Sequence, residues 1–178
     1  KLPFSNTFLL HWGHPHRGDV VVFRYPENPD VFFVKRVIAI SGDHVEVLNG
    51  DLVINGEIIP QTALPRDVAV KNITFEEGFD YFLENPLGSF SLSPHVVRYQ
   101  NKANSFFHSV TMPKDSFFVM GDNRDQSSDS RYWGDVPEQN LVGSATYIWL
   151  ACDKTLESAA ILCDPQTIRW NRVGLRIR

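Results

Sequence analysis

Residues 121–134, GDNRDQSSDSRYWG, are the stretch around which the rest of the chain is organised. They follow an apolar run, FFVM at residues 117–120, that is typical of a buried strand. Gly121 lets the backbone turn sharply out of this strand, because glycine has no Cβ to clash. A turn needs only a Gly, Asn or Asp, yet the segment contains three Asp, two Arg and three Ser. This excess of charges of both signs predicts a polar network that fixes side chains in place.

Two structural interpretations of this segment compete with a functional one. Surface ion pairs in a solvated loop contribute little to stability, so they do not explain why so many charges gather here. A calcium-binding loop would alternate oxygen ligands, but Arg124 and Gln126 stand where acids are needed, and we discount calcium. Because binding and catalysis concentrate on loops held by a rigid scaffold, a functional site is our hypothesis for residues 121–134.

The composition is that of an ordinary globular protein. The 178 residues are 43% hydrophobic and 21% charged, enough for one domain with a real core and an insertion. A net charge of −4 gives no indication of nucleic-acid binding. The 13 Phe and 4 Trp suit a β-rich core or a surface that lies against lipid.

Three features of the sequence bear on its cellular setting. No run approaches the ~20 apolar residues that span a bilayer, and no signal peptide is visible. The chain starts at Lys1 without an initiator Met, so we expect a fragment of a longer protein. Cys152 and Cys163 are close enough for a short bridge. They would stay reduced in the cytosol and could form a disulfide in an oxidising compartment, and the sequence leaves both states open.

Strand patterns and turn signals run along most of the chain. They occur at residues 20–25, 31–40, 44–59, 141–150 and 173–177, the last as a candidate edge strand. A 3.6-residue period is present only weakly, at residues 154–162. Between residues 60 and 112 regular periodicity fades while Pro, Ser and Asn become frequent. We therefore predict an all-β fold of mostly antiparallel sheets, with a barrel-like core from residues 1–59 and 113–178 and an inserted smaller β-subdomain, or long loops, at residues 60–112.

Two short motifs near the N-terminus have simpler explanations than a binding function. His11, His14 and His16 could bind zinc, but no Cys or carboxylate neighbours them, and Pro15 breaks any helix that would align them. We predict an exposed loop there and no metal site. Turn chemistry explains the Arg-Gly-Asp triplet at residues 17–19. Its Gly-Asp pair recurs at residues 42–43 and 121–122, each time beside a predicted strand.

Residues 31–40, VFFVKRVIAI, place Lys35 and Arg36 inside an apolar strand. Neighbouring residues of a strand face opposite sides, so the two cations cannot share a face. One or both could guard a sheet edge against aggregation. Alternatively, Lys35 could be a desolvated amine, since lysine acts as a base only when neutral and burial lowers its pKa from ~10.4 by up to 3–5 units. A shift of about 2–3 units costs on the order of 3–4 kcal/mol, which a fold accepts only where a site needs it.

Two segments of the sequence resemble conserved regions of the type I signal peptidases, which are membrane-anchored serine endopeptidases with a Ser/Lys dyad. Residues 121–134 match GDNRDxSxDSRxWG, the most specific box of the family, which opens with Gly121 and Asp122. Residues 17–43 contain RGDxVVF, a Pro-containing turn, VKRV and GD, which resemble a second region. We also expect Arg36 to pair with Asp122, on the strand face that the lysine does not occupy.

The resemblance implies a role for each matching polar residue. Lys35 would be the general base, and Ser127 would hydrogen-bond its amine and orient it. Asp129 and Arg131 would form an ion pair that shapes the wall around that amine. These last three residues come from a segment far away in the sequence, which explains why that segment is so densely polar. The implied chemistry needs no metal or organic cofactor.

The resemblance also implies how substrate binds. In the family, the strand that carries the lysine offers its backbone to the substrate, which adds as an extended strand. Phe32, Phe33 and Val34, with Val22 from the neighbouring strand, would then line shallow apolar pockets. Small pockets accept small side chains, which matches the Ala-x-Ala pattern before a signal-peptide cleavage site. Packing in the core is the alternative role for all four residues.

The attacking serine of the family lies upstream, in a Ser-Met-x-Pro-Thr-like segment just after the membrane anchor. Ser5 is followed by Asn6-Thr7 and departs from that pattern. We therefore expect the chain as written to lack the nucleophile, much of the oxyanion hole and the anchor, and to be inactive. The parent protein would remove signal peptides from secretory precursors, with its catalytic domain against the lipid surface on the periplasmic side of the bacterial inner membrane, and would bind no nucleic acid.

Two other classes of protein fit part of this pattern. Self-cleaving repressors of the DNA-damage response use the same Ser/Lys chemistry on a related β scaffold, but they carry a helix-turn-helix and a cleavable linker that this sequence does not show. A non-catalytic β-rich binding or assembly module with decayed catalytic residues would account for the missing serine. Intact Lys35, Ser127, Asp129 and Arg131 argue against such decay.

Overall fold

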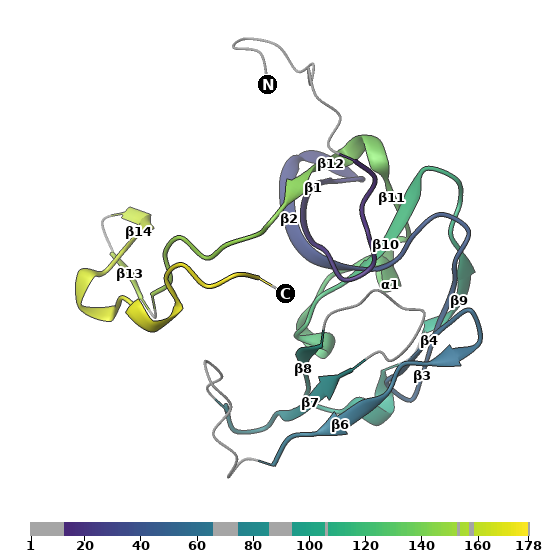
Figure 1. Ribbon diagram of the computed structural model, residues 1–178, viewed down its shortest axis with the longest axis horizontal. Helices are drawn as coiled ribbons and strands as arrows, with labels where there is room; N and C mark the ends of the chain where they lie inside the picture. The colour runs from purple at the N-terminus through teal and green to yellow at the C-terminus, as the bar shows by residue number, and fades with distance from the viewer. Residues whose placement is uncertain are drawn as a thin grey trace.

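A five-stranded sheet lies at the centre of the fold, with the strand order β11-β10-β2-β1-β12 and antiparallel pairing throughout. The strands are β1 (Val20–Tyr25), β2 (Asn28–Ala39), β10 (Ser116–Met120), β11 (Val136–Pro137) and β12 (Leu141–Ser144). Figure 1 shows this sheet strongly curled, with β1 and β2 wound next to each other. The computed structural model describes residues 13–65, 75–85, 94–105, 107–152, 154–156 and 159–177.

The apolar run that leads into residues 121–134 forms β10, which is buried along its whole length. Alternate residues of a strand face opposite sides, so β10 contributes to two hydrophobic clusters. Phe117 and Val119 pack with Val21 and Phe23 of β1 in one cluster. Phe118 and Met120 pack in the other, whose remaining buried members are Ile38, Ala39, Val45, Val47, Leu52, Ile54, Ile59 and Met112. A strand held on both faces is a rigid support for the segment that follows it.

A four-stranded sheet in the order β5-β4-β3-β9 carries the second cluster. Its strands are β3 (His44–Leu48), β4 (Asp51–Ile54), β5 (Glu57–Ile58) and β9 (Phe107–Thr111). Asn-Gly pairs at 49–50 and 55–56 turn the chain with positive φ at both residues, as tight hairpin turns require. The hairpin pattern predicted for residues 44–59 is therefore present.

A third, three-stranded sheet lies below these two in Figure 1. It has the order β6-β7-β8 and consists of β6 (Gln61–Ala63), β7 (Asp80–Glu84) and β8 (His95–Tyr99). These strands fall within residues 60–112, where the sequence predicted an inserted β-subdomain or long loops. The last strand of that range, β9, pairs instead with β3.

The C-terminal part forms an arm that projects from the sheets in Figure 1. It contains the strand pair β13 (Thr155–Leu156) and β14 (Ala159–Cys163), and a disulfide joins Cys152 to Cys163. The weak 3.6-residue period at residues 154–162 does not mark a helix, because the described residues of this disulfide-closed loop form an antiparallel strand pair. The predicted strand at 141–150 ends at Ser144. The tail forms no edge strand of the main sheets and lies along residues 146–148 through a few backbone hydrogen bonds.

The short helical elements are confined to turns and to the polar segment. The α-helix of the described residues is a single turn, α1 (Ser130–Trp133). The 3₁₀ turns are η1 (Lys102–Asn104), η2 (Arg124–Gln126), η3 (Glu138–Asn140), η4 (Pro165–Thr167) and η5 (Trp170–Arg172). Across the described residues, no helix is long and apolar enough to cross a membrane.

The all-β, mostly antiparallel fold class is confirmed, but the curled sheet does not close into a barrel. Its end strands, β11 and β12, are not paired with each other in the described part of the chain. The reason lies in β11, which is two residues long and ends at Pro137. Proline has no N–H to donate, so it cannot extend a ladder toward a further strand.

Candidate active site

Lys35 and Ser127 meet although 92 residues separate them in the sequence. Lys35 is half-buried on β2, and its Nζ donates a hydrogen bond to Ser127 Oγ over 2.7 Å. Ser127 is buried and follows η2 directly. The structure therefore brings together the two residues for which the sequence predicted contact.

The surroundings of the Lys35 amine favour its neutral form. Desolvation is the main cause that lowers the pKa of Lys35, since burial disfavours the charged ammonium. The negative charge of Asp129 opposes this shift, while the positive charge of Arg131 adds to it. The ring of Phe33, two residues earlier on the same strand face, lies 5.6 Å from Nζ at its centroid. A lysine in such a place is a candidate base at ordinary pH.

Gly121 is required by the close approach of Ser127. A Cβ at position 121 would lie 2.3 Å from Ser127 Oγ, 2.7 Å from Ser127 Cβ and 3.5 Å from Lys35 Nζ. The backbone of Gly121 is not in the positive-φ region, so the sharp turn expected from the sequence is not the reason for a glycine here. The reason is space beside the lysine amine.

The Asp129–Arg131 pair holds the segment that carries Ser127. Arg131 donates to both carboxylate oxygens of Asp129, each over 2.8 Å, and Asp129 also accepts from the backbone N–H of Gly121 over 3.0 Å. Asp129 is fully buried and caps α1. Desolvation alone would raise the pKa of Asp129, but the hydrogen bonds and charge of Arg131 outweigh it and lower that pKa. The carboxylate is thus a fixed negative charge close to the Lys35 amine.

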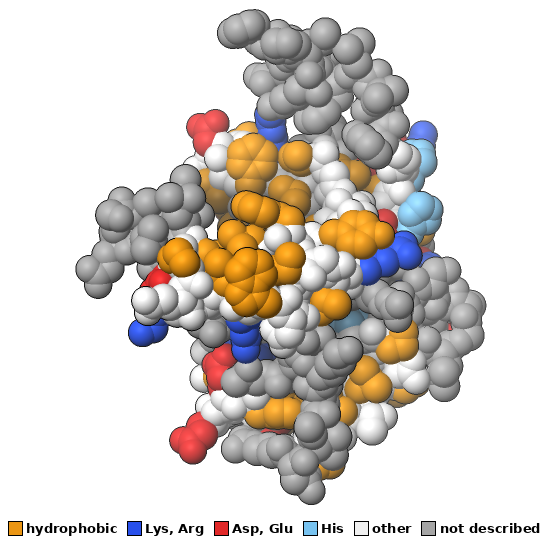
Figure 2. Space-filling model, turned by 60° about the vertical axis from the view of Figure 1, so that its left-hand side comes forward, with side chains coloured by type: hydrophobic (Ala, Val, Ile, Leu, Met, Phe, Trp, Pro, Cys, Tyr) orange, Lys and Arg blue, Asp and Glu red, His pale blue; other side chains and the backbone are white. Residues whose placement is uncertain are grey.

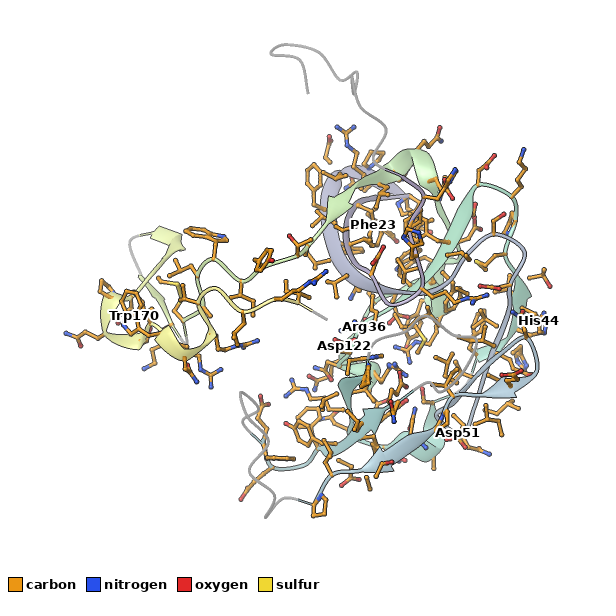
Figure 3. The ribbon with its side chains drawn as sticks, viewed as in Figure 1. Phe23, Arg36, His44, Asp51, Asp122 and Trp170 are labelled. Carbon is orange, nitrogen blue, oxygen red and sulfur yellow. A yellow bond between two sulfur atoms is a disulfide. The ribbon has the colours of Figure 1, made fainter. Side chains whose placement is uncertain are left out.

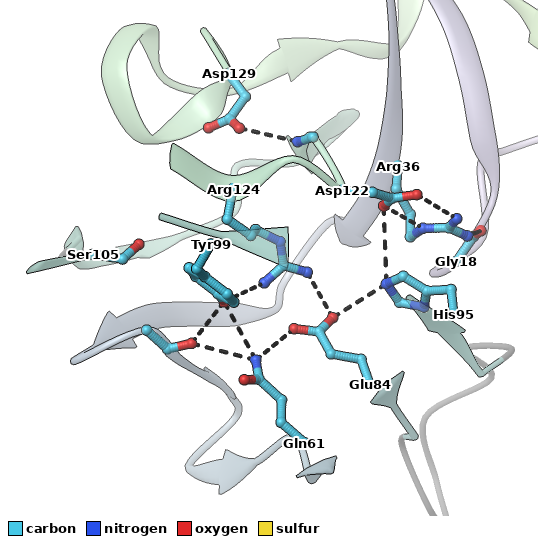
Figure 4. A network of polar contacts seen from close by, with 12 residues as sticks. Gly18, Arg36, Gln61, Glu84, His95, Tyr99, Ser105, Asp122, Arg124 and Asp129 are labelled. Carbon is cyan, nitrogen blue, oxygen red and sulfur yellow. Dashed lines mark hydrogen bonds and ion pairs between the residues drawn. The ribbon is translucent and has the colours of Figure 1, made fainter. Parts of the chain in front are cut away.

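Arg36 and Asp122 form the second predicted pair, on the opposite face of β2. Arg36 Nε and Nη2 each donate to one oxygen of Asp122 over 2.9 Å, and Nη1 donates to the Gly18 carbonyl over 3.0 Å. Arg36 is buried, and Figures 3 and 4 show it facing Asp122. Desolvation disfavours the Asp122 carboxylate, yet the hydrogen bonds from Arg36 prevail and lower the pKa of Asp122. This pair ties the start of residues 121–134 to the strand that carries Lys35.

A buried polar network beside this pair was not foreseen from the sequence (Figure 4). Arg124 Nη2 donates to Glu84 Oε2 over 2.6 Å, and Arg124 Nη1 donates to the Tyr99 hydroxyl over 3.1 Å. His95 Nε2 lies 3.2 Å from the same Glu84 oxygen and 4.0 Å from Asp122 Oδ1. Desolvation opposes both charges of the central pair, but their mutual attraction holds the pKa of Glu84 well below its usual range and raises that of Arg124. The alternation that places His95, Val97 and Tyr99 on one face of a strand is the sequence signal that could have indicated an inward-facing His95.

The four residues proposed for substrate pockets do not lie on one surface. Phe32 and Val34 are exposed, at 53% and 58%, and Val22 pairs directly with Val34 on that face. Phe33 faces the other way, because side chains alternate along a strand. Its ring packs against those of Phe23, Tyr25 and Trp133.

The N-terminal motifs behave as turns and surface residues. His14 and His16 are exposed, and His11 lies outside the described residues. His14 Nδ1 lies 2.6 Å from Glu138 Oε2. Within the described ranges, no three His, Cys, Asp or Glu residues are placed to hold a metal ion. Arg17 forms an ion pair with the buried Asp43, which explains this arginine structurally.

Comparison with known proteins places this site in a family. The family model described as signal peptidase, peptidase S26, matches residues 3–150. Signal peptidase I of Pseudomonas aeruginosa is 34% identical over 177 residues, covering 85% of this chain and 55% of that protein. Signal peptidase I of Aquifex aeolicus is 31% identical over 175 residues, covering 81% and 66%. The crystal structure of a signal peptidase I from Enterococcus faecalis matches with a TM-score of 0.44 and 28% identity, covering 75% of this chain and 98% of that chain.

The matches cover most of this chain but only part of the length of its relatives. The chain spans about half the length of the two Pseudomonas proteins it matches, 55% of each. The matched residues 3–150 include both segments that the sequence comparison rested on, 17–43 and 121–134. This chain belongs to the signal peptidase family, peptidase S26.

Proposed function

We propose that the full-length protein is a type I signal peptidase, a serine endopeptidase that removes signal peptides from secretory precursors after a small residue. The contact that carries the proposal is the 2.7 Å hydrogen bond between Lys35 Nζ and Ser127 Oγ, in a place where desolvation lowers the pKa of the lysine. A half-buried lysine with a fixed hydroxyl partner is suited to proton transfer.

In the proposed reaction, Lys35 moves a proton twice. The neutral amine takes the proton of an attacking serine hydroxyl while the serine oxygen adds to the scissile carbonyl, and the ammonium then gives that proton to the leaving amine. This leaves an acyl-enzyme and frees the mature protein. Lys35 next takes a proton from water as that water attacks the ester, and the ammonium then returns a proton to the serine oxygen as the ester bond breaks and the signal peptide leaves. The family resemblance assigns the attacking serine to a Ser-Met-x-Pro-Thr-like segment, and Ser127 keeps the amine oriented toward it.

The pairing of β2 supports the proposal that substrate binds as an added strand. The neighbour β10 pairs with β2 at Arg36, Val37 and Ala39. In the described part of the chain, residues 32–35 of β2 pair with β1 and have no strand partner on their other side. An edge with free backbone groups next to Lys35 is what an extended peptide needs to bind. Exposed Phe32 and Val34 on this stretch are candidates for contact with its side chains.

A lipid surface is the second proposed partner, and the proposed location is the periplasmic side of the bacterial inner membrane. Trp149, Trp170 and Tyr147 of the C-terminal arm are exposed, at 82%, 72% and 62%. Figure 2 shows hydrophobic side chains gathered on the face that includes the arm. Tryptophan and tyrosine favour the boundary between lipid and water, because their rings are apolar and carry a polar group.

The test of the proposed function is Lys35→Ala in the full-length protein, assayed on a secretory precursor. We expect cleavage to fall by ~100-fold or more, since general-base catalysis contributes about 10²–10⁴. The circular dichroism spectrum and thermal midpoint should change little. Lys114→Ala, at an exposed turn, is the matched control and should cleave normally. Normal cleavage by Lys35→Ala would rule out the lysine as the base.

A further inference from the structure

Backbone N–H groups at the end of the small sheet β6-β7-β8 bind the polar segment, residues 121–134. Arg98 N of β8 donates to the Asp122 carbonyl over 2.9 Å, and residues 98 and 123 form a parallel bridge. Just beyond β8, Gln100 N and Asn101 N both donate to Asp125 Oδ2, over 2.6 and 2.8 Å. The end of β8 therefore runs alongside residues 122–125 and fixes their course.

Side chains of the same sheet hold the segment from within. We refer to Glu84, His95, Tyr99 and Arg124 as the clamp. All four are nearly inaccessible to solvent, at 0%, 6%, 0% and 1%. Glu84 is itself held by Gln61 Nε2 over 2.7 Å, and Tyr99 OH donates to the Gly50 carbonyl over 2.9 Å. Contacts with β6 and with the turn between β3 and β4 thus anchor Glu84 and Tyr99, and both of these bind Arg124.

Arg124 connects the other three clamp residues to the groups around the Lys35 amine. Its carbonyl accepts a hydrogen bond from the Arg131 guanidinium, which also binds Asp129. Asp129 in turn accepts from Gly121 N. Ser127 lies in the loop that these contacts close, one residue beyond η2. A shift of η2 would move the Ser127 hydroxyl relative to Nζ.

Stability alone does not account for these buried charges. Replacing a buried ion pair by apolar residues of similar size is often neutral or stabilising, so such pairs are weak devices for stability. Directional contacts, by contrast, restrict a segment to one geometry. We infer that Glu84, His95 and Tyr99 are positioning residues, which act through Arg124 to hold Ser127 against Lys35 Nζ. The inference rests on the proposed function, because it assigns these residues to the same site.

The first test is Glu84→Gln in the full-length protein, with Asp80→Asn, at the exposed first position of the same strand β7, as the control. We expect kcat to fall ~10- to 100-fold with little change in KM, because a displacement of about 1 Å at a catalytic group can cost 10²-fold. The control should retain normal kcat. A merely structural role would lower the thermal midpoint and leave kcat unchanged at temperatures where the protein is folded, which would overturn the inference.

The second test uses Tyr99→Phe, which removes one hydroxyl and keeps the ring, so the fold should survive. The pH dependence of kcat/KM and lysine-selective ¹⁵N NMR of the full-length protein both report on Lys35. A loosened loop admits water to the amine among its charged neighbours Asp129, Arg131 and Asp122. We therefore expect Lys35 in Tyr99→Phe and Glu84→Gln to titrate at higher pH than in the parent protein.

The NMR readout separates this inference from the proposed function. A Lys35 that titrates near ~10.4 in the unaltered protein would contradict the proposed function itself. A lowered pKa that stays the same in both variants, together with unchanged kcat, would overturn only the role of the clamp. A shift in the variants but not in Asp80→Asn would support it.

Discussion

At the scale of single residues, the site depends on Gly121 having no Cβ. Gly121 leaves room for the Ser127 side chain, which a Cβ would meet at 2.3 Å. Backbone on one side and a capped helix turn on the other leave Ser127 little freedom to retreat. The contact that orients Lys35 therefore requires a glycine at position 121.

Gly121→Ala is expected to displace Ser127 and lower activity by at least ~10-fold, since the amine loses its fixed partner. The added methyl should also destabilise the fold by about 1–3 kcal/mol, the usual effect of overpacking. Precursor cleavage and urea unfolding of the full-length protein measure the two effects. Gly143→Ala is the matched control, because a Cβ there meets nothing within 4 Å.

A second prediction concerns pH. Because neutral Lys35 is the proposed base, kcat/KM should fall as the pH drops through the lysine pKa, which desolvation lowers from its ordinary value. The acid limb of the profile should therefore lie below ~10.4 and follow a single ionisation. Initial rates on a peptide substrate, taken across the range in which the protein stays folded, give the profile. A flat profile would contradict a lysine base.

The sequence predicted some of these residues and missed others for physical reasons. Lys35 and Ser127 could be paired in advance because both lie in motifs that resemble one family. Glu84 and His95 lie in no motif, and their partner Arg124 is 40 residues from Glu84. The role of a charged residue that faces inward on a strand can be inferred only once its partner is known. Local pattern alone could not reveal the clamp.

At the scale of elements, β2 has two parts with different neighbours. Its residues 36–39 are buried, and Arg36, Val37 and Ala39 pair with β10, whereas residues 32–35 pair with β1 alone in the described part of the chain. Lys35 stands at the junction of the two parts. The proposed base is thereby fixed by the packed part of β2 and lies beside the part with an open edge.

If substrate adds to this edge as a strand, N-methylation of the substrate backbone should reduce cleavage at every second position. In an added strand, successive N–H groups point alternately toward and away from the partner strand. Substrate peptides N-methylated one position at a time before the cleavage site should therefore show reduced and normal kcat/KM in alternation, by ~10-fold at the affected positions. Equal effects at every position would argue against strand addition.

The elements themselves were predicted unevenly. β1, β10 and the hairpin of β3 and β4 follow from apolar runs and Asn-Gly turns, which are local signals. The strands β6, β7 and β8 were not resolved in advance, because inward positions such as Gln61, Glu84 and His95 are polar and disrupt the alternation. The helical period at residues 154–162 was misleading because a disulfide and a strand pair decide the backbone there.

At the scale of the whole molecule, the two packed sheets and the arm differ in what holds them. The five-stranded and four-stranded sheets share one cluster of buried apolar residues, and a second cluster lies within the five-stranded sheet. The arm is closed by Cys152–Cys163 and exposes Trp149 and Trp170. The sequence could not settle the disulfide, since its formation depends on the redox state of the compartment.

Replacing both cysteines by serine should therefore loosen the arm and leave the sheets unchanged. A disulfide of this span typically contributes about 2–4 kcal/mol, and the loss should stay local because regions open independently. Hydrogen exchange followed by mass spectrometry should show faster exchange at residues 145–177 and unchanged exchange in β1, β2 and β10. Faster exchange throughout the central sheet would mean that the bridge supports the whole fold.

Because Lys35 and Arg36 are neighbours on β2, the register of this strand decides which of the two cations lies beside Ser127. Val21 lies opposite Lys35 and Met120 opposite Arg36. A slip of β2 by one position that carried the Arg36 guanidinium to the Ser127 hydroxyl would carry the Lys35 amine to the exposed place of Val34. Arginine stays protonated at any pH a protein survives, so the misaligned molecule would be folded and unable to accept a proton. The alignment of one β-ladder thus decides whether a lysine or an arginine occupies the position of the proposed base.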